Sequence, residues 1–305
     1  MRHAHQTKHH PSAPSDLGRA FAIGVALNVG FVVLEAAAGL WTHSLALLAD
    51  AGHNLSDVLA LLLAWGAATL SARLPDARFT FGLRSSTVLV ALVNALLLLV
   101  ACGAISWEAV GRLREPVAVA GGVVVVVAAF GVAINAATAL LFLPRQKGDL
   151  NVRGAYLHMA ADALVSLGVV VAGVAMLATG WAWLDPVVSL AVVAVIFAST
   201  WGLARDALGL ALQAVPAGID PAAVRGYLGA RPGVVNVHDL HIWGMSTTEN
   251  ALSAHLVIPG GHPGDQFLAQ TTQELAQRFG IGHATLQIEH GDTEHPCALE
   301  PDHVV

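Results

Sequence analysis

The sequence predicts a membrane all-α domain of six transmembrane helices, followed by a small C-terminal α+β domain. Three observations predict this architecture. The chain of 305 residues is 55% hydrophobic and only 12% charged, whereas soluble domains carry about 25% charged residues. Up to residue 206 it contains six apolar stretches of roughly 20 residues, the length of a membrane-spanning helix. Beyond that point, polar residues become frequent and the apolar stretches become short.

Each of the six stretches is long enough and apolar enough to cross a bilayer as a helix. Buried helices of a soluble protein would need amphipathic helices to cover them, and this region has none. The first stretch is longer than the core of a signal peptide, about 7–15 residues, so we do not expect it to be cleaved. The expected spans are about 18–41, 46–70, 85–107, 119–143, 154–179 and 183–203.

Basic residues predict the orientation of these spans. They precede the first span and lie between spans two and three and between spans four and five, whereas the opposite side has only Arg112 and Arg114. By the positive-inside rule, both termini are cytoplasmic. We expect the protein in the plasma (inner) membrane. Residues 1–17 form a histidine-containing tail that we expect to be disordered, although it could loosely collect Zn²⁺.

The C-terminal region reads as a soluble domain over residues 207–292, with a tail at 293–305. Asp220 is the expected N-cap of a helix over 220–230, with Pro221 at its first position. Residues 234–243, 251–259 and 284–290 alternate like half-buried strands, and 264–280 is an amphipathic helix ended by Gly280. The order αββαβ predicts a two-layer domain. Because it is small, pairing with a second copy or metal binding would stabilise it.

Two apolar spans carry the same polar pair. His53 and Asp57 are four residues apart in the second span, and His158 and Asp162 are four apart in the fifth. Residues four apart share one helix face. If the two helices pack side by side they run antiparallel, so that His53 lies level with Asp162 and Asp57 with His158. The sequence therefore predicts a cluster of two imidazoles and two carboxylates near the middle of the membrane.

A divalent cation would explain such a cluster. A carboxylate at mid-membrane costs roughly 2.5–3.5 kcal/mol on insertion scales. Four nitrogen and oxygen ligands suit Zn²⁺, whereas Ca²⁺ and Mg²⁺ prefer more oxygens and no imidazole. Two His–Asp pairs that pin helices together, or a proton relay without metal, are the alternatives. The repetition of the motif on two separate helices favours the metal.

The ordered set of motifs resembles the cation diffusion facilitator family, in its zinc-transporter branch. "LLADAGHNLSD" and "HMAAD" resemble the signatures of the family's second and fifth helices. "PDARFTFGLR" resembles its loop after helix two, and "HDLHIW", "SAHLVI" and "HATLQIE" resemble its cytoplasmic domain. The resemblance implies a six-helix domain with a ferredoxin-like cytoplasmic domain, a homodimer, and export of divalent metal from the cytoplasm in exchange for protons. It also implies that His53, Asp57, His158 and Asp162 form the transport site.

The resemblance further implies a cytoplasmic metal site. Family members bind zinc at the positions of His238, His255, His283 and Glu289. His290 and Asp292 are alternatives to Glu289, and Cys297 could supply a thiolate. Strand alternation would turn His241 to the opposite face. The loop after helix two has Phe79 and Leu83 where some relatives carry histidines, so we expect no metal there. Asp76 is expected to cap a turn in that loop.

Other polar residues of the spans have weaker signals. Glu35 is costly unless paired, so it has either a proton-carrying or a structural role. Asp50 either lines the exit path or holds a helix contact. Asn28, Asn94 and Asn135 are expected to hydrogen-bond between helices rather than to contact metal.

The expected function is export of Zn²⁺, with Cd²⁺ or Co²⁺ possible, by exchange for protons that compete for the same ligands. The partners are membrane lipid and a second copy of the chain. The net charge of −6 gives no nucleic-acid character. A membrane-embedded zinc hydrolase is one alternative. It would need an open coordination position, and the sequence has no HExxH motif, so we expect no enzyme. A zinc sensor without transport is the other alternative.

Overall fold

The computed structural model describes residues 15–71, 75–143, 150–292 and 296–300. The side chains of some helical residues in these ranges, Asp57 among them, are outside this description. Most of the expected N-terminal tail, and parts of the C-terminal one, likewise lie outside the described residues. The chain folds into two compact units. One combines residues up to 59 with residues 98–198, and the other combines residues 60–97 with those from 199 onward.

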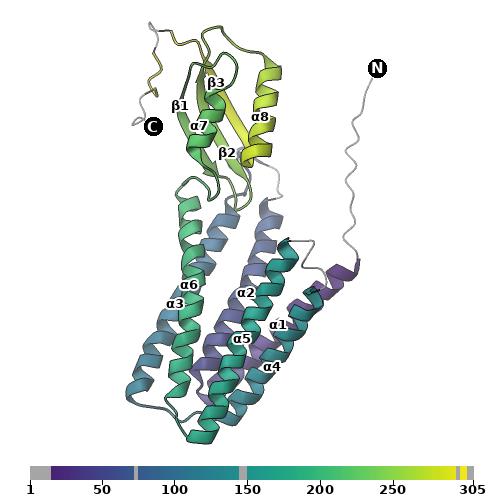
Figure 1. The fold of residues 1–305 in the computed structure, drawn as a ribbon, viewed down its shortest axis with the longest axis vertical. Coiled ribbons are helices and arrows are strands. Elements are labelled where there is room, and N and C mark those ends of the chain that lie inside the picture. Colours follow the sequence, from purple (N-terminus) through teal and green to yellow (C-terminus); the bar gives the residue numbers. More distant parts are fainter. Residues whose placement is uncertain (1–14, 72–74, 144–149, 293–295, 301–305) are drawn as a thin grey trace. The chain divides into compact units, whose positions relative to one another are not determined.

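Six long helices come first in the chain (Figure 1). Among the described residues, four of them hold stretches long and apolar enough to cross a membrane, and α1 is apolar over the shorter stretch Asn28–Thr42. Helix α6 continues beyond residue 206, where we expected the membrane domain to end. The helices are α1 (Ser15–Thr42), α2 (Leu45–Ser71), α3 (Ser86–Arg114), α4 (Gly121–Phe142), α5 (Leu150–Thr179) and α6 (Leu184–Ala211).

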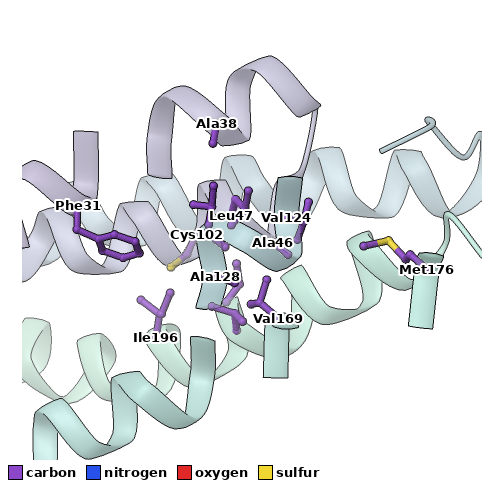
Figure 2. Packing of buried hydrophobic residues seen from close by; sticks show 14 residues of the cluster. Phe31, Ala38, Ala46, Leu47, Cys102, Val124, Ala128, Val169, Met176 and Ile196 are labelled. Carbon is purple, nitrogen blue, oxygen red and sulfur yellow. The ribbon is translucent and has the colours of Figure 1, made fainter. Parts of the chain in front are cut away.

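The core of the first unit is built mainly from small and branched side chains of all six helices, together with Phe31 and Met176, and Figure 2 shows them converging. Helices α4 and α5 pack closely because glycines, which lack a side chain, lie at their contact. A Cβ atom on Gly173 of α5 would lie 2.7 Å from Cγ2 of Val125 on α4, and one on Gly131 of α4 would lie 3.2 Å from Oγ of Ser166 on α5. Glycine therefore sets how closely these helices approach.

The C-terminal region contains α7 (Pro221–Gly229), β1 (Asn236–Gly244), β2 (Asn250–Val257), α8 (Asp265–Phe279) and β3 (Ile281–Glu289). The order αββαβ is the predicted one. The Asp220 carboxylate accepts a hydrogen bond from the Ala222 amide at 2.9 Å, as expected for the N-cap. Gly280 ends α8 with a φ of 68°, which glycine adopts without a Cβ clash.

The three strands form one sheet in the order β1-β2-β3. Strands β1 and β2 are antiparallel, while β2 and β3 are parallel and are joined through α8. Helix α7 packs on β1, α8 packs on β3, and the two helices contact each other, so both cover the same face. Val224 and Leu228 of α7, Leu275 of α8 and Leu252 and Leu256 of β2 are completely buried between the layers. The region therefore has a hydrophobic core of its own.

The loop before α3 is organised by Asp76. Its carboxylate accepts hydrogen bonds from the amides of Arg78 and Phe79, both at 2.7 Å. This confirms the predicted turn-capping role of Asp76.

Candidate metal sites

In the candidate site of the apolar helices, His53 and His158 both approach Asp162. Nε2 of His53 lies 3.3 Å from Oδ1 of Asp162, and Nε2 of His158 lies 3.6 Å from Oδ2. The centroids of the two imidazole rings are 6.1 Å apart, with the rings nearly perpendicular. Asp162 is buried with 2% exposure. Two nitrogen donors from α2 and α5 thus face the two oxygens of one buried carboxylate.

The helix period explains this meeting. His158 and Asp162 share one face of α5, because they are four residues apart. His53 of α2 lies level with Asp162, which is the pairing expected for antiparallel helices. Asp57 lies one turn along α2 from His53, inside the helix. Its side chain is outside the described set, so the geometry concerns three of the four predicted residues.

A second set of polar side chains lies one turn away along α2. The Ser166 hydroxyl donates a hydrogen bond of 2.9 Å to Asp50. The Asn54 amide donates one of 3.2 Å to Glu35. All four side chains are buried, and the two carboxyl groups interact with each other. Glu35 and Asp50, the predicted accessory residues, therefore belong to one polar network that joins α1, α2 and α5.

Asp185 is a buried carboxylate that sequence reasoning missed. It stands at the start of α6 and accepts hydrogen bonds from the Ser44 hydroxyl at 2.5 Å and from the Leu45 amide at 2.8 Å. The Ala46 amide approaches it at 3.3 Å. The carboxylate satisfies backbone donors at the N-terminus of α2 and complements the dipole of that helix. A lone aspartate next to a proline gave no signal of this role.

The cytoplasmic cluster brings together four side chains of the types that zinc prefers. One ligand atom from each of His238, His255, Glu289 and Cys297 lies within 4.8 Å of the others. Nε2 of His238 is 3.2 Å from Oε2 of Glu289, and Nδ1 of His255 is 2.9 Å from Oε1. Sγ of Cys297 is 3.6 Å from Nδ1 of His255. Two imidazoles, a carboxylate and a thiol fit a tetrahedral zinc site.

Burial of His238 supports this fit. His238 is 3% exposed, and neither of its ring nitrogens, including the Nε2 that lies beside Glu289, has a hydrogen-bond partner in the part of the chain that the structure describes. A buried polar atom without a partner is costly unless an ion or water satisfies it. A cation bound in the cluster would therefore supply the partner that the histidine lacks.

Strand register explains why His283 lies apart from this cluster. His255 of β2 pairs with His238 of β1 on one side and with Gln287 of β3 on the other. Glu289 follows at that end of β3, whereas His283 pairs with Ala251 at the opposite end. Six residues of strand span about 20 Å. The imidazole of His283 instead contacts the ring of Phe81, with centroids 5.6 Å apart.

His290 and Asp292, the alternatives to Glu289, line a cleft of about 690 Å³ next to the cluster, together with Cys297. Neither belongs to the cluster among the described residues. The carboxylate that approaches both histidines is that of Glu289.

A β-bulge adds a residue that sequence reasoning missed. The pairing of β1 with β2 shifts between His238 and His241, and Asp239 has a φ of 48°. The bulge aims the Asp239 carboxylate at two histidines, His241 at 2.8 Å and His255 at 3.3 Å. Regular alternation hides such a contact, because a bulge changes the direction of the side chains that follow.

The electrostatics of the cluster favour an ionised carboxylate and a protonated thiol. Burial alone would raise the pKa of Glu289, but hydrogen bonds from Gln287 and Cys297 and the nearby imidazoles hold it below its usual range. The Leu299 amide favours the Cys297 thiolate, but desolvation and the carboxylates of Glu289 and Asp239 outweigh it and raise the pKa of the thiol. A bound cation would reverse this preference, since it competes with the proton for sulfur.

Comparison with known proteins identifies the family. Residues 21–210 match the model of the cation efflux transmembrane domain, and residues 216–291 match that of the cation efflux protein cytoplasmic domain. The metal cation efflux system protein CzcD of Cupriavidus metallidurans is 35% identical over 293 residues, which cover 96% of this chain and 93% of that protein.

Two further relatives match at similar coverage. The zinc transporter ZitB of Escherichia coli is 36% identical over 297 residues, covering 97% of this chain and 93% of ZitB. A cadmium, cobalt and zinc/H(+)-K(+) antiporter of Bacillus subtilis is 32% identical over 282 residues, covering 91% of this chain and 90% of that protein. Both domain models and the full-length relatives agree with the motifs, and the chain therefore belongs to the cation diffusion facilitator (cation efflux) family, in its zinc-transporter branch.

Proposed function

We propose that this protein exports divalent metal cations, Zn²⁺ first, from the cytoplasm in exchange for protons. The observation that supports this proposal most is the approach of His53 and His158, from two different helices, to the buried carboxylate of Asp162. A carboxylate at this depth needs a compensating positive charge. Two imidazoles and carboxylate oxygens are donors that suit Zn²⁺. Asp57 is the proposed fourth ligand.

Proton exchange follows from the same donors. Zinc binds neutral imidazole and ionised carboxylate, so each bound proton opposes metal binding. Histidine has a reference pKa of about 6.5, which lets the site change its protonation near physiological pH. If the site opens alternately to the two sides of the membrane, competition becomes exchange. The name of the relative from Bacillus subtilis includes cadmium, cobalt and H⁺, which supports Cd²⁺ and Co²⁺ as further cargo.

The proposed arrangement has six membrane spans within residues 18–206, both termini in the cytoplasm, and a plasma (inner) membrane location. Residues 207–292 form the cytoplasmic domain, with the ferredoxin-like fold that the family resemblance implies, between tails at 1–17 and 293–305. A small domain with three strands gains stability from pairing, and we propose a homodimer surrounded by lipid.

The cytoplasmic cluster is proposed as a resident zinc site. His238, His255, Glu289 and Cys297 would hold the ion, which would join β1, β2, β3 and the tail after them. Because a structural zinc ion contributes its binding energy to folding, occupancy would stiffen this part of the domain when cytoplasmic zinc rises. Export would thereby respond to the zinc concentration of the cytoplasm.

Flux in reconstituted liposomes tests the proposal. Purified protein is placed in vesicles that hold a zinc-sensitive dye and, in a parallel set, a pH-sensitive dye. We expect Zn²⁺ movement, opposite proton movement, and loss of both in Asp162→Asn. Zinc binding without any flux would contradict export and favour the zinc sensor, while hydrolysis without flux would favour the membrane hydrolase.

A further inference from the structure

Asn135 of α4 is a buried amide without a hydrogen-bond partner among the residues that the structure describes. Its side chain is 0% exposed. Neither Oδ1 nor Nδ2 has a hydrogen-bond partner among the residues that the structure describes. The expectation of an interhelical hydrogen bond is therefore wrong for this asparagine within that part of the chain. An unsatisfied buried amide costs about 1–3 kcal/mol per group, which calls for an ion or water at its position.

Contacts between α4 and α5 locate this amide along the helix pair. A Cβ atom on Gly121 would lie 3.3 Å from the carbonyl oxygen of Gly173 and from Cγ of Leu177, whereas one on Gly131 would lie 3.2 Å from Oγ of Ser166. As the residue numbers of these contacts increase along α4, those of their partners decrease along α5. The two helices are antiparallel.

One turn beyond the last of these contacts, Asn135 on α4 lies level with Asp162 on α5. Asn135 follows Gly131 by four residues on α4, and Asp162 precedes Ser166 by four residues on α5. Because the helices are antiparallel, both steps move about 6 Å in the same direction along the helix pair. Four residues also keep a side chain on roughly the same helix face.

Burial supports the meeting of these two helix faces. On α4, Val124, Ala128 and Asn135 are each 0% exposed and follow one stripe. On α5, Ser166 and Val169 are 0% exposed and Asp162 is 2% exposed. Figure 2 shows Val124, Ala128 and Val169 gathered in the same core. Asn135 therefore continues the α4 stripe to the level of the transport site.

We infer that Asn135 is a fifth residue of the transport site, whose carboxamide oxygen contacts the transported cation directly or through a water that the cation keeps. The inference rests on the proposed export function. An amide oxygen is a neutral, hard donor, so it adds coordination without adding charge and bears on which divalent cation is accepted. Its position on α4 would give the site a contribution from a third helix.

Three variants test this role in the full-length protein. Asn135→Leu keeps the branching of the side chain, with a larger volume, but removes the amide, and Asn135→Asp replaces the amide by a carboxylate of the same shape. Thr138→Val is the matched control, because the Thr138 hydroxyl bonds the Ile134 carbonyl within the same helix at 2.8 Å. Transport of Zn²⁺, Cd²⁺ and Mn²⁺ is measured in liposomes for each variant and for the wild type.

We expect Asn135→Leu to raise the apparent KM for Zn²⁺ roughly tenfold or more, the usual loss when a group around a metal site is removed. Asn135→Asp should move the ranking from Zn²⁺ toward Mn²⁺, because a carboxylate suits harder cations. The control should match the wild type. A merely structural amide would leave the ranking of cations unchanged in Asn135→Asp, and that result would overturn the inference.

The outcomes separate this inference from the export proposal. If the wild type moves no metal, the export proposal fails before the variants are compared. If the wild type exports zinc and both Asn135 variants keep its KM and its ranking, only the role of Asn135 fails. Should Asn135→Leu not fold, Asn135→Asp, which has the same size, still decides the ranking.

Discussion

Nε2 of His238 and Oε2 of Glu289 lie 3.2 Å apart, although the two residues belong to the outer strands of the sheet. The middle strand makes this possible, because His255 of β2 contacts both of them. A cation at this place would bind residues of all three strands.

Loss of His255 should weaken zinc binding by the isolated cytoplasmic domain, residues 207–305, which has its own hydrophobic core. Removing the central ligand of four should lower the affinity by at least 10–100-fold, about the loss measured for groups that only support a metal site. Titration calorimetry in two buffers of different ionisation enthalpy measures both affinity and proton release.

His283→Ala is the matched control for His255→Ala. It removes a histidine of the same sheet that lies at the other end of β3. We expect wild-type affinity from it. An equal loss in both variants would contradict the four-residue site, and absence of zinc uptake by the wild-type domain would remove the site altogether.

A second prediction concerns the membrane site. Asp162→Asn should abolish zinc transport, because it removes the charge that His53 and His158 approach. The amide has nearly the same volume, so size-exclusion chromatography should still show a folded dimer. Asp57→Ala should behave alike if its side chain completes the site. Wild-type flux in Asp162→Asn would refute the transport site.

Much of the fold follows from patterns in the sequence. The length of the apolar stretches predicted the long helices, and Asp220 and Gly280 marked the start of α7 and the end of α8, because caps depend on local chemistry. Antiparallel packing and a four-residue spacing were enough to place His53 level with Asp162. These features depend on neighbours in the sequence or on a single helix contact.

The remaining features depend on register, which the sequence does not specify. Alternation placed His283 on a strand. It could not show that His283 lies at the opposite end of that strand from the residue that pairs with His255. The bulge at Asp239 and the bonds from Asp185 to the start of α2 join distant segments. Asn135 has no signal in the sequence that sets it apart from other membrane asparagines, because its level relative to Asp162 depends on how α4 packs against α5.

A third prediction addresses selectivity. His53→Asp should shift transport from Zn²⁺ toward Mn²⁺ or Cd²⁺, since an oxygen donor replaces a nitrogen beside Asp162. Competition assays with mixed cations in liposomes measure the ranking. An unchanged ranking, with flux retained, would mean that His53 does not contact the cargo.

A fourth prediction concerns pH. Tyr227 packs against the ring of Phe279 at 5.6 Å and beneath the guanidinium of Arg278 at 5.0 Å. Burial, above all, raises the pKa of Tyr227 above its ordinary value of 10.0. The neutral Tyr227 side chain therefore contributes its full share to folding stability below the pKa of the unfolded state. This contribution is lost as pH rises through the higher pKa of the folded state.

Tyr227→Phe should remove this alkaline loss, because phenylalanine fills the same space and does not ionise. Urea unfolding of the isolated domain between about pH 8 and pH 11 measures the slope of stability against pH. We expect a shallower fall in the variant. Identical slopes in both proteins would show that Tyr227 does not carry the effect.

The last prediction concerns Asp185, which binds the start of the helix that carries His53. Its carboxylate receives the Leu45 amide and the Ser44 hydroxyl in a completely buried place. Asp185→Ala would leave buried donors unsatisfied, at a cost of roughly 1–3 kcal/mol. The melting temperature in detergent should fall, and zinc transport should fall with it as α2 loses its anchor.

Glu108→Ala is the control, because this carboxylate is exposed and pairs with Arg112 of its own helix, a contact worth about 0.3–0.5 kcal/mol. Equal melting temperatures for the two variants would mean that Asp185 does not stabilise the start of α2.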